Sequence, residues 1–500
     1  MNTFFDENFL LENDKARELY AQVKNLPIFD YHCHLSPQEI YENRTFYDLT
    51  ELWLECDHYK WRVMRNAGCS EDLVTGNAAN YDKFLAFAHS LPLFPGNPVY
   101  HWAHLELKKY FGIRTPLSEK TAPDIWEQTK KQMSDGSFCA RNLIKNSNVD
   151  TIFTTDDPVS DLKFHKLLAA EKIDGKINFT VSPSFRPDRA VNIEKDDFMS
   201  YISDLQKSSD VIISDFSSLI HALENRLKFF VDNGCRIADI SFTDFPMSTF
   251  NSTSNKNYDR LKINADKAFK AKYDNSSGLS AFMSDFKYCV IKELALLFKK
   301  YDITMQIHTG VLRNVNSVRF SQCGADCGID SVGNTIDIEA AGILFDDIEK
   351  TGIEKGFSGG LPRTILYTLN PTAYYPMSTM IGDFAGKYDI SDNTSGGRMQ
   401  LGAAWWFMDH RDGIKEQLQI FANTSGLGLF NGMLTDSRSF VSYARHDYFR
   451  RVLCSVIGKW IQDGEYPDDE NAIELVKNIS FYNAKKNFGT SSKCATGGTK

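Results

Sequence analysis

The chain has 500 residues, among them 65 acidic and 56 basic side chains, which give a formal net charge of −9. This acidic balance argues against a nucleic-acid partner, because nucleic-acid-binding proteins carry a surplus of lysine and arginine on one face. Hydrophobic residues make up 42% of the chain and aromatic residues 13%, which is sufficient for a large packed core.

The first residues contain neither the basic stretch nor the apolar stretch of a signal peptide. No run of about 18 apolar residues occurs in the sequence, so we expect no membrane span and no membrane partner. The ten cysteines do not show the paired spacing of a zinc finger or zinc ribbon. We therefore expect reduced thiols and a cytoplasmic location.

Eight short apolar runs recur along the chain, and segments with helical periodicity, such as 218–233 and 282–301, lie between most of them. Runs of this length are typical of buried parallel strands. The pattern predicts an α/β fold in which eight strands and their helices close into a (β/α)8 barrel, with an open doubly wound sheet as the alternative. The expected strands are 28–32, 151–155, 177–181, 236–240, 303–308, 364–369, 399–405 and 432–435.

The gap between the first two expected strands is far longer than one helix requires. Residues 41–146 are rich in tryptophan, tyrosine, leucine and phenylalanine, so we expect a helical insertion over the rim formed by the C-terminal strand ends. Residues 1–488 are expected to form a single domain that includes this insertion. The remaining residues, 489–500, are small and polar, which predicts a disordered tail.

The first expected strand ends in His32-Cys33-His34. Residues i and i+2 of an extended segment point to the same side, and at the C-terminal end of a barrel strand that side faces the active site. Two neutral imidazoles there form half of a divalent metal site. The alternative is two polar histidines at a surface turn.

Two further strand ends carry potential metal ligands. His308 ends the fifth expected strand and Asp436 follows the eighth. Taken singly, His308 could be a hydrogen-bonded core histidine and Asp436 the N-cap of a helix. Together with the first strand, they would supply three histidines and one aspartate to one rim, which is a plausible mixed nitrogen and oxygen site for a divalent ion.

Several sequence blocks resemble those of the uronate isomerases, a family of the amidohydrolase superfamily. The blocks follow the family order over nearly the whole chain, and the last two are long and specific. They are FDYHCHL (29–35), TTDDP (154–158), PSFRPD (183–188), LRNVN (312–316), WWFMD (405–409), GMLTDSRSF (432–440) and RHDYFRR (445–451).

The resemblance implies an aldose-ketose isomerase that interconverts D-glucuronate with D-fructuronate, and D-galacturonate with D-tagaturonate, by proton transfer between C2 and C1. It also implies one divalent metal ion, zinc, and a small-molecule uronate as substrate, and we expect a homo-oligomer. The implied metal ligands are His32, His34 and Asp436, with His308 as an additional one; the implied catalytic residues are Asp436, Tyr59 and His58; and the implied substrate-binding residues are Arg186 and Arg438.

The chemistry of these residue types suits the reaction. Arginine presents a planar fork of donors to a carboxylate, which suits Arg186 and Arg438, although each could instead form a surface ion pair. Asp436, beside a metal and an arginine, would stay ionised and could act as a base. Tyr59 could exchange a proton with a sugar oxygen, or could simply pack in the aromatic insertion.

One departure from the family pattern is visible. Many members carry Ser-Asp-His-Gly where this chain has Ala238-Asp239-Ile240-Ser241, so the histidine is missing. The same strand end also lacks the metal-bridging lysine of many binuclear hydrolases, which weighs against the main alternative, a metal-dependent hydrolase of an acidic sugar derivative or lactone. A non-catalytic sugar-acid-binding barrel is a further alternative, which the intact set of candidate ligands disfavours.

Overall fold

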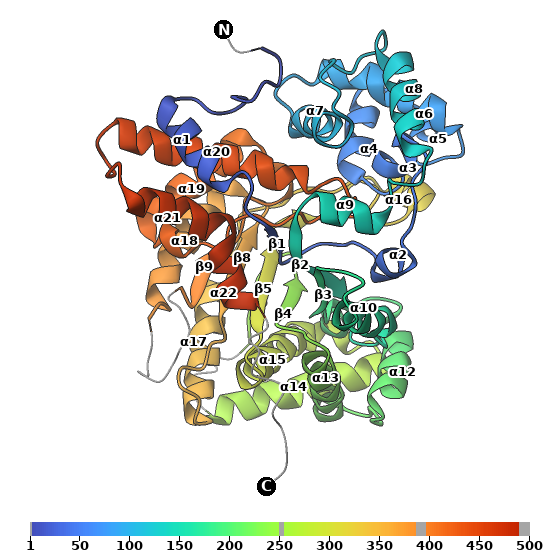
Figure 1. Ribbon diagram of the computed structural model, residues 1–500. Helices are drawn as coiled ribbons and strands as arrows, with labels where there is room; N and C mark the ends of the chain where they lie inside the picture. Colours follow the sequence, from blue (N-terminus) through green and yellow to red (C-terminus); the bar gives the residue numbers. More distant parts are fainter. Residues whose placement is uncertain (1–2, 250–254, 387–396, 490–500) are drawn as a thin grey trace.

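The computed structural model describes residues 3–249, 255–386 and 397–489. Within them, seven parallel strands form one sheet in the order β1-β2-β3-β4-β5-β8-β9, and helices pack around it (Figure 1). Consecutive long strands are neighbours in the sheet, as expected of strand–helix–strand units. The strands are β1 (Ile28–Asp30), β2 (Val149–Asp156), β3 (Thr180–Phe185), β4 (Ile237–Ser241), β5 (Thr304–Thr309), β8 (Thr364–Thr368) and β9 (Met399–Leu401).

The ends of several strands differ from those expected. β3 begins at Thr180 instead of residue 177, and β1 ends at Asp30, before the first histidine of the motif. β9 ends at Leu401, and the next residue, Gly402, lies against the ring of Tyr367, where an added Cβ would be 2.0 Å from a ring carbon. Apolar periodicity gives no sign of such a close approach.

The expected eighth strand is wrong, because residues 432–435 form no strand ladder among the described residues. Gly432 and Asp436, at the two ends of this segment, have φ angles of 76° and 44°, which lie in the left-handed region that strands do not use. The segment is fixed to β1 through a side chain, and just beyond it the backbone N–H of Asp436 donates to the carbonyl oxygen of His32 at 3.1 Å. The carboxylate of Asp30 accepts the backbone N–H of Thr435 at 2.9 Å and the hydroxyl of Thr435 at 2.6 Å.

The chain between β1 and β2 is helical, and α4 to α8 gather on one side of the molecule, in blue to teal at the upper right of Figure 1. Asp57 is the N-cap of α4, and its carboxylate accepts the backbone N–H of Tyr59 at 2.9 Å. The helices are α2 (Pro37–Glu42), α3 (Leu49–Trp53), α4 (His58–Asn66), α5 (Glu71–Val74), α6 (Asn80–Ser90), η1 (Leu91–Leu93), α7 (Pro98–Phe111), α8 (Ala122–Met133) and α9 (Ala140–Asn146).

The remaining helices precede β1, connect the other strands or follow the sheet. Those before or between strands are α1 (Asp14–Val23), α10 (Lys163–Ile173), α11 (Asp188–Val191), α12 (Phe198–Ser209), α13 (Phe216–Asp232), α14 (Asn255–Tyr273), α15 (Leu279–Lys300), α16 (Ser317–Cys323), α17 (Ile338–Glu354), η2 (Pro371–Ala373) and α18 (Tyr374–Asp383). Those after β9 are η3 (Trp406–Met408), α19 (Arg411–Thr424), η4 (Leu427–Leu429), α20 (Ala444–Gln462), α21 (Glu470–Lys477), η5 (Asn478–Tyr482) and α22 (Asn483–Phe488).

A small antiparallel sheet, which the sequence did not predict, follows β5. Its strands are β6 (Val311–Leu312) and β7 (Ser331–Val332), and we call residues 311–332 the β6–β7 segment. Arg62 of α4 donates from Nη1 to the carbonyl oxygen of Asp330 in this segment at 2.9 Å. The segment therefore connects the end of β5 with the inserted helices.

No helix in the described part of the chain has the length and apolar content needed to span a membrane. The expected disordered tail lies, apart from Gly489, outside the described residues.

Candidate active site

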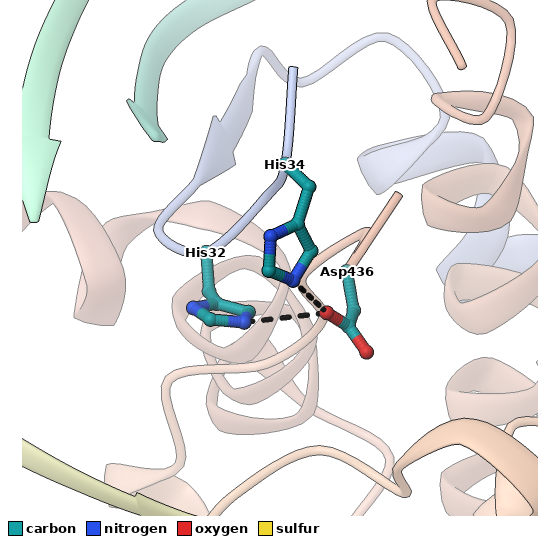
Figure 2. A group of neighbouring side chains, drawn as sticks. All are labelled: His32, His34 and Asp436. Carbon is teal, nitrogen blue, oxygen red and sulfur yellow. Dashed lines mark ion pairs between the residues drawn. The ribbon is translucent and has the colours of Figure 1, made fainter. Parts of the chain in front are cut away.

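Two histidines and one aspartate come together where β1 and the segment after residue 432 end (Figure 2). Nε2 of His32 lies 3.2 Å, and Nε2 of His34 3.1 Å, from the same oxygen, Oδ1 of Asp436. One potential ligand atom from each of the three lies within 4.8 Å of the others. Because alternate residues of an extended segment point to one side, both imidazoles reach the same carboxylate.

The protonation states of this triad suit a divalent cation. Burial lowers the pKa of His34 to about 4, so its imidazole is neutral at pH 7. Burial would raise the pKa of Asp436, but the hydrogen bonds and charges of His32 and His34 hold it well below its usual range. For His32, burial opposes the protonated form, yet the carboxylates of Asp239 and Asp436 raise the pKa overall. A cation would displace that proton, since metal ligands bind in their deprotonated forms.

His308, near the end of β5, adjoins the triad without being one of its members. Its ring centroid lies 5.0 Å from that of His32. Nδ1 of His308 lies 2.7 Å from Oδ1 of Asp239, and burial lowers the pKa of His308, so the neutral ring donates its Nδ1–H to that carboxylate. Nε2 is buried and has no protein partner within the described residues. This tautomer leaves the Nε2 lone pair free for a metal, which is the arrangement that ligating histidines adopt.

Arg186, just beyond the end of β3, is bound by two carboxylates. Nε donates to Oδ2 of Asp188 at 2.9 Å, and Nη1 lies 3.3 Å from Oδ2 of Asp239. Burial would raise the pKa of Asp239, but the charges of Arg186 and His308 lower it. Asp239 therefore connects Arg186 with His308 and keeps its negative charge.

The triad lines a polar cavity with a volume of about 70 Å³. The cavity contains three arginines and four carboxylates besides its histidines and tryptophans. The lining residues are His32, His34, His58, Arg186, Asp239, Ser241, His308, Arg313, Asp326, Gly328, Asp330, Trp405, Trp406, Asp436 and Arg438.

The first turn of α4 contributes His58 to the cavity wall, whereas Tyr59 is not among the lining residues. The two rings stack with their centroids 4.7 Å apart, and Tyr59 also packs against Trp102 at 5.5 Å. The guanidinium of Arg445 lies 4.8 Å from the Tyr59 ring centroid. Burial raises the pKa of Tyr59 well above its usual range and lowers that of His58, so the phenol stays protonated and the imidazole neutral.

The second oxygen of Asp436 is also held. Nε1 of Trp405 donates to Oδ2 of Asp436 at 2.8 Å, so neither oxygen can rotate freely. Asp436 and Trp406 adopt left-handed φ angles of 44° and 49°, which are uncommon for residues other than glycine. Such backbone strain is concentrated at functional sites, and here it occurs at two residues of one cavity.

Arg438 extends into the cavity from the segment that carries Asp436. Its Nη2 donates to Oδ2 of Asp326 at 3.0 Å, and the Asp326 side chain is 56% exposed. A pair with such an exposed carboxylate contributes little binding free energy, so a ligand can replace it readily.

The missing histidine of the 238–241 block leaves the cavity intact. Ile240, which stands in its place, is fully buried in the core, whereas Asp239 and Ser241 on either side line the cavity. Because successive residues of a strand alternate between its two sides, position 240 faces away from the site.

Comparison with known proteins identifies the family. The family described as glucuronate isomerase matches residues 1–488. The sequence is 46% identical to a uronate isomerase of Caldanaerobacter subterraneus subsp. tengcongensis, over 98% of this chain and 100% of that relative. The chain belongs to the glucuronate isomerase family. Membership makes it an isomerase, and the hydrolase alternative is not favoured.

Solved structures of the family share the fold. The crystal structure of a uronate isomerase from Thermotoga maritima superposes with a TM-score of 0.87 at 31% identity, covering 97% of this chain and 100% of that one. A glucuronate isomerase from Caulobacter crescentus gives a TM-score of 0.83 at 25% identity, covering 97% and 96%. The glucuronate isomerase fold therefore extends over nearly the whole chain.

Sequence reasoning missed three groups that contact the candidate residues: Asp239, Trp405 and Asp326. Asp239 lies in the departing block and Trp405 in the WWFMD block, but the sequence assigned neither residue a role. A polar residue near a strand end was the available signal for Asp239. Nothing in the sequence marks Asp326, because its partner Arg438 is 112 residues away.

Proposed function

We propose that this protein interconverts D-glucuronate with D-fructuronate, and D-galacturonate with D-tagaturonate, by moving a proton between C2 and C1. The observation that carries the proposal is that the imidazoles of His32 and His34 both contact Oδ1 of Asp436. This contact lies in a cavity that also contains arginines, and the chain belongs to the glucuronate isomerase family.

We further propose that one divalent ion, zinc, binds His32, His34 and Asp436, with His308 beside them. The unpartnered Nε2 of His308 and the neutral His34 support this donor set, since mixed imidazole and carboxylate ligands suit zinc. When bound, such an ion supplies a Lewis acid for a sugar oxygen.

The charge balance of the cavity agrees with both proposals. The lining contains three arginines and four aspartates, and the histidines other than His32 are neutral at pH 7. A divalent cation that displaces the proton of His32 leaves one negative charge in excess on the protein side chains and adds two positive charges, so the loaded site carries a slight positive excess. The resulting site is complementary to a substrate with a single carboxylate.

Asp436 is the proposed base. Its low pKa keeps it ionised, and the hydrogen bond from Trp405 fixes the direction of its carboxylate. In the open-chain aldose, Asp436 would take the proton from C2 while the C2–H electron pair forms the C1–C2 double bond and the π pair of the C1 carbonyl moves to O1, which takes up a proton to complete the enediol. The same carboxylate would return the proton to C1 as the ketone forms at C2, which needs one base on one face of the sugar.

A second group must move the proton between the two oxygens of the enediol. His58 lies in the cavity wall and is neutral, so it can accept and donate. Tyr59, with its raised pKa, can only donate, and it stands behind His58. Arg186 and Arg438 are the proposed substrate-binding arginines. The positive charge of Arg186 is already balanced by the two carboxylates that contact it.

The deciding experiment incubates purified, zinc-loaded protein with D-glucuronate and, separately, D-galacturonate, and follows ketose formation by ¹³C NMR. The proposal expects an equilibrium mixture of aldose and ketose with wild type and loss of most turnover with Asp436→Asn. Unchanged uronates after long incubation with metal-loaded, folded wild type would refute it.

Three wider expectations stay proposals. Residues 432–435 would occupy the place of the eighth strand and close the barrel, a role that the contacts of Asp30 with Thr435 support. Residues 1–488 would then form a single domain with 41–146 inserted. We also propose that the protein is cytoplasmic and that it forms a homo-oligomer. Light scattering of the purified protein tests the oligomeric state.

A further inference from the structure

A second cavity lies at the amino ends of the strands, away from the candidate active site at their carboxyl ends. It has a volume of about 400 Å³ and lies where Ile28, the first residue of β1, and Asn148, just before β2, meet the helices α7 and α20. We call it the α7–α20 cavity. Among the described residues, none lines both this cavity and the candidate active site. A ligand in it would therefore occupy a site of its own.

The wall of the α7–α20 cavity has a surplus of positive charge. Its two carboxylates are already paired: Glu7 lies 3.0 Å from Nζ of Lys108, and Asp447 accepts Nε of Arg451 at 2.8 Å. Three of the five lining cations are left without a carboxylate partner within the described part of the chain. The five cations are Lys24, Lys108, Lys109, Arg450 and Arg451.

Arg450 of α20 contributes a buried charge to this wall. The residue is 3% exposed, and Nη1 and Nη2 donate to the backbone carbonyl oxygens of Leu26 and Pro27 at 2.8 and 2.6 Å. Its Nε is buried and has no hydrogen-bond partner in the described residues. Burial lowers the pKa of Arg450 to about 10. Because a buried cation without a counter-ion is unfavourable, an anion in the adjoining cavity would stabilise it.

Lys24 and Lys109 are the accessible cations of the cavity. Both residues are exposed, and the described residues offer neither ammonium a hydrogen bond or an ion pair. Desolvation by the surrounding protein lowers the pKa of Lys109 to about 8, against the charge of Asp447, so the ammonium is still charged at pH 7. On α20, burial and the charges of Arg450 and Lys109 hold the pKa of His446 well below its usual range. The potential in this region is therefore positive.

Volume and charge together define the chemistry of a ligand. Sites for small molecules have volumes of about 300–1,000 Å³, and the α7–α20 cavity lies within that range. Three uncompensated cations are best matched by more than one negative charge. A phosphate monoester carries about −1.5 to −2 at pH 7, whereas a carboxylate carries only one. The apolar side chains of Leu26, Ile28 and Leu105 in the wall can contact the organic part of such a molecule.

We propose that the α7–α20 cavity is a second ligand site and that it binds the phosphate group of a small phosphorylated metabolite. Lys24 and Lys109 contact the phosphate, and Arg450 adds its charge from the wall. Hydrogen bonds between charged groups of this kind are about twice as strong as those between neutral groups. The inference concerns neither the uronate nor the metal, and it does not rest on the proposed function.

The test is isothermal titration calorimetry of the full chain at constant ionic strength, with D-glucose 6-phosphate, inorganic phosphate and D-glucose as separate titrants. We expect D-glucose 6-phosphate to bind, inorganic phosphate to bind more weakly because it cannot contact the apolar wall, and D-glucose not to bind. The double variant Lys24→Ala/Lys109→Ala should weaken the binding of D-glucose 6-phosphate by at least about 10-fold, because it removes two hydrogen bonds between charged groups.

The matched control is Lys130→Ala/Lys228→Ala. It removes the same charge from exposed positions on α8 and α13 that do not line the cavity, so the affinity should stay that of wild type. Circular dichroism and thermal unfolding establish that each variant is folded. Equal weakening in the two double variants would overturn the proposal, because net charge and not the cavity would then govern binding.

Three further results would also overturn it. The first is the absence of binding of both phosphate compounds to wild type. The second is binding that survives Lys24→Ala/Lys109→Ala and is lost in the presence of D-glucuronate, since that result assigns the phosphate to the candidate active site. The third is equal affinity for inorganic phosphate and D-glucose 6-phosphate, which would make free phosphate and not a metabolite the ligand.

Discussion

Nδ1 of His308 and Oδ1 of Asp239 are 2.7 Å apart at the carboxyl ends of the neighbouring strands β5 and β4. Within the sheet, His308 pairs with Ser241, which places Asp239 diagonally across from it on the same face. One carboxylate thus sets the tautomer of a candidate ligand and also contacts Arg186. Three predictions concern this site, and a fourth concerns stability.

Asp239→Asn should weaken metal binding. An amide oxygen is a weaker acceptor than a carboxylate for the Nδ1–H of His308. Loss of the hydrogen-bond partner of a ligating histidine typically lowers metal affinity by about 10- to 100-fold. Zinc affinity is measured by competition with a chromophoric chelator. Asp188→Asn is the matched control, because Asp188 contacts Arg186 and the backbone of Ser241 but not His308. Equal zinc affinity in Asp239→Asn and wild type would contradict the expectation.

Zinc should stabilise the wild-type fold through the triad. A ligand that binds only the folded state at about 100 times its Kd adds about 2.7 kcal/mol to the free energy of unfolding. We therefore expect the Tm to fall when a chelator removes the metal and to recover with added zinc. In His34→Ala the metal-dependent part of the shift should disappear. A chelator-insensitive Tm in wild type, or full retention of the shift in His34→Ala, would count against the site.

Proton transfer should depend on Asp436 and on the pair His58 and Tyr59. In deuterated water, a base that stays on one face transfers part of the C2 hydrogen directly to C1. We expect Asp436→Asn and Tyr59→Phe each to lower kcat by about two orders of magnitude or more, the usual scale for general acid-base groups. Near-normal turnover in Asp436→Asn would contradict the assignment of the base, and near-normal turnover in both Tyr59→Phe and His58→Asn would contradict the role of the pair.

Asp156 should make stability fall as pH rises from about 4 to about 7. Burial raises the pKa of Asp156 to about 7, whereas an unfolded aspartate has a pKa of about 3.9. Between these values the folded state holds a proton that the unfolded state has released, so the free energy of unfolding decreases with pH, by up to about 1.4 kcal/mol per unit.

The check is urea unfolding at a series of pH values. Asp156→Asn removes the titrating group but keeps an acceptor for the hydroxyl of Thr154, which lies 2.7 Å from Oδ2. Its curve should be flatter than that of wild type in this window. Asp174→Asn, on an exposed residue, should follow wild type. Parallel curves for Asp156→Asn and wild type would exclude the effect.

Local patterns predicted much of this molecule, and long-range contacts explain what they missed. The spacing of His32 and His34 and the position of His308 near the end of β5 sufficed to place these candidate ligands, because direction along a strand is a local property. Asp436 was placed after an expected strand that the structure does not contain among its described residues. The contact of residues 432–435 with β1 runs through Asp30, which lies 405 residues before Thr435 in the chain. Trp405 likewise acts through a partner that only the folded chain brings near.

The bond between Asp30 and Thr435 has a consequence for how the protein is made. His32 and His34 leave the ribosome early, and Asp436 leaves after more than four-fifths of the chain has been synthesised. A nascent chain therefore holds two of the converging donors for most of its synthesis, and the third arrives only when the last segment docks on β1. Assembly of the donor set is in this sense a late event, and a chain truncated before residue 436 cannot complete it.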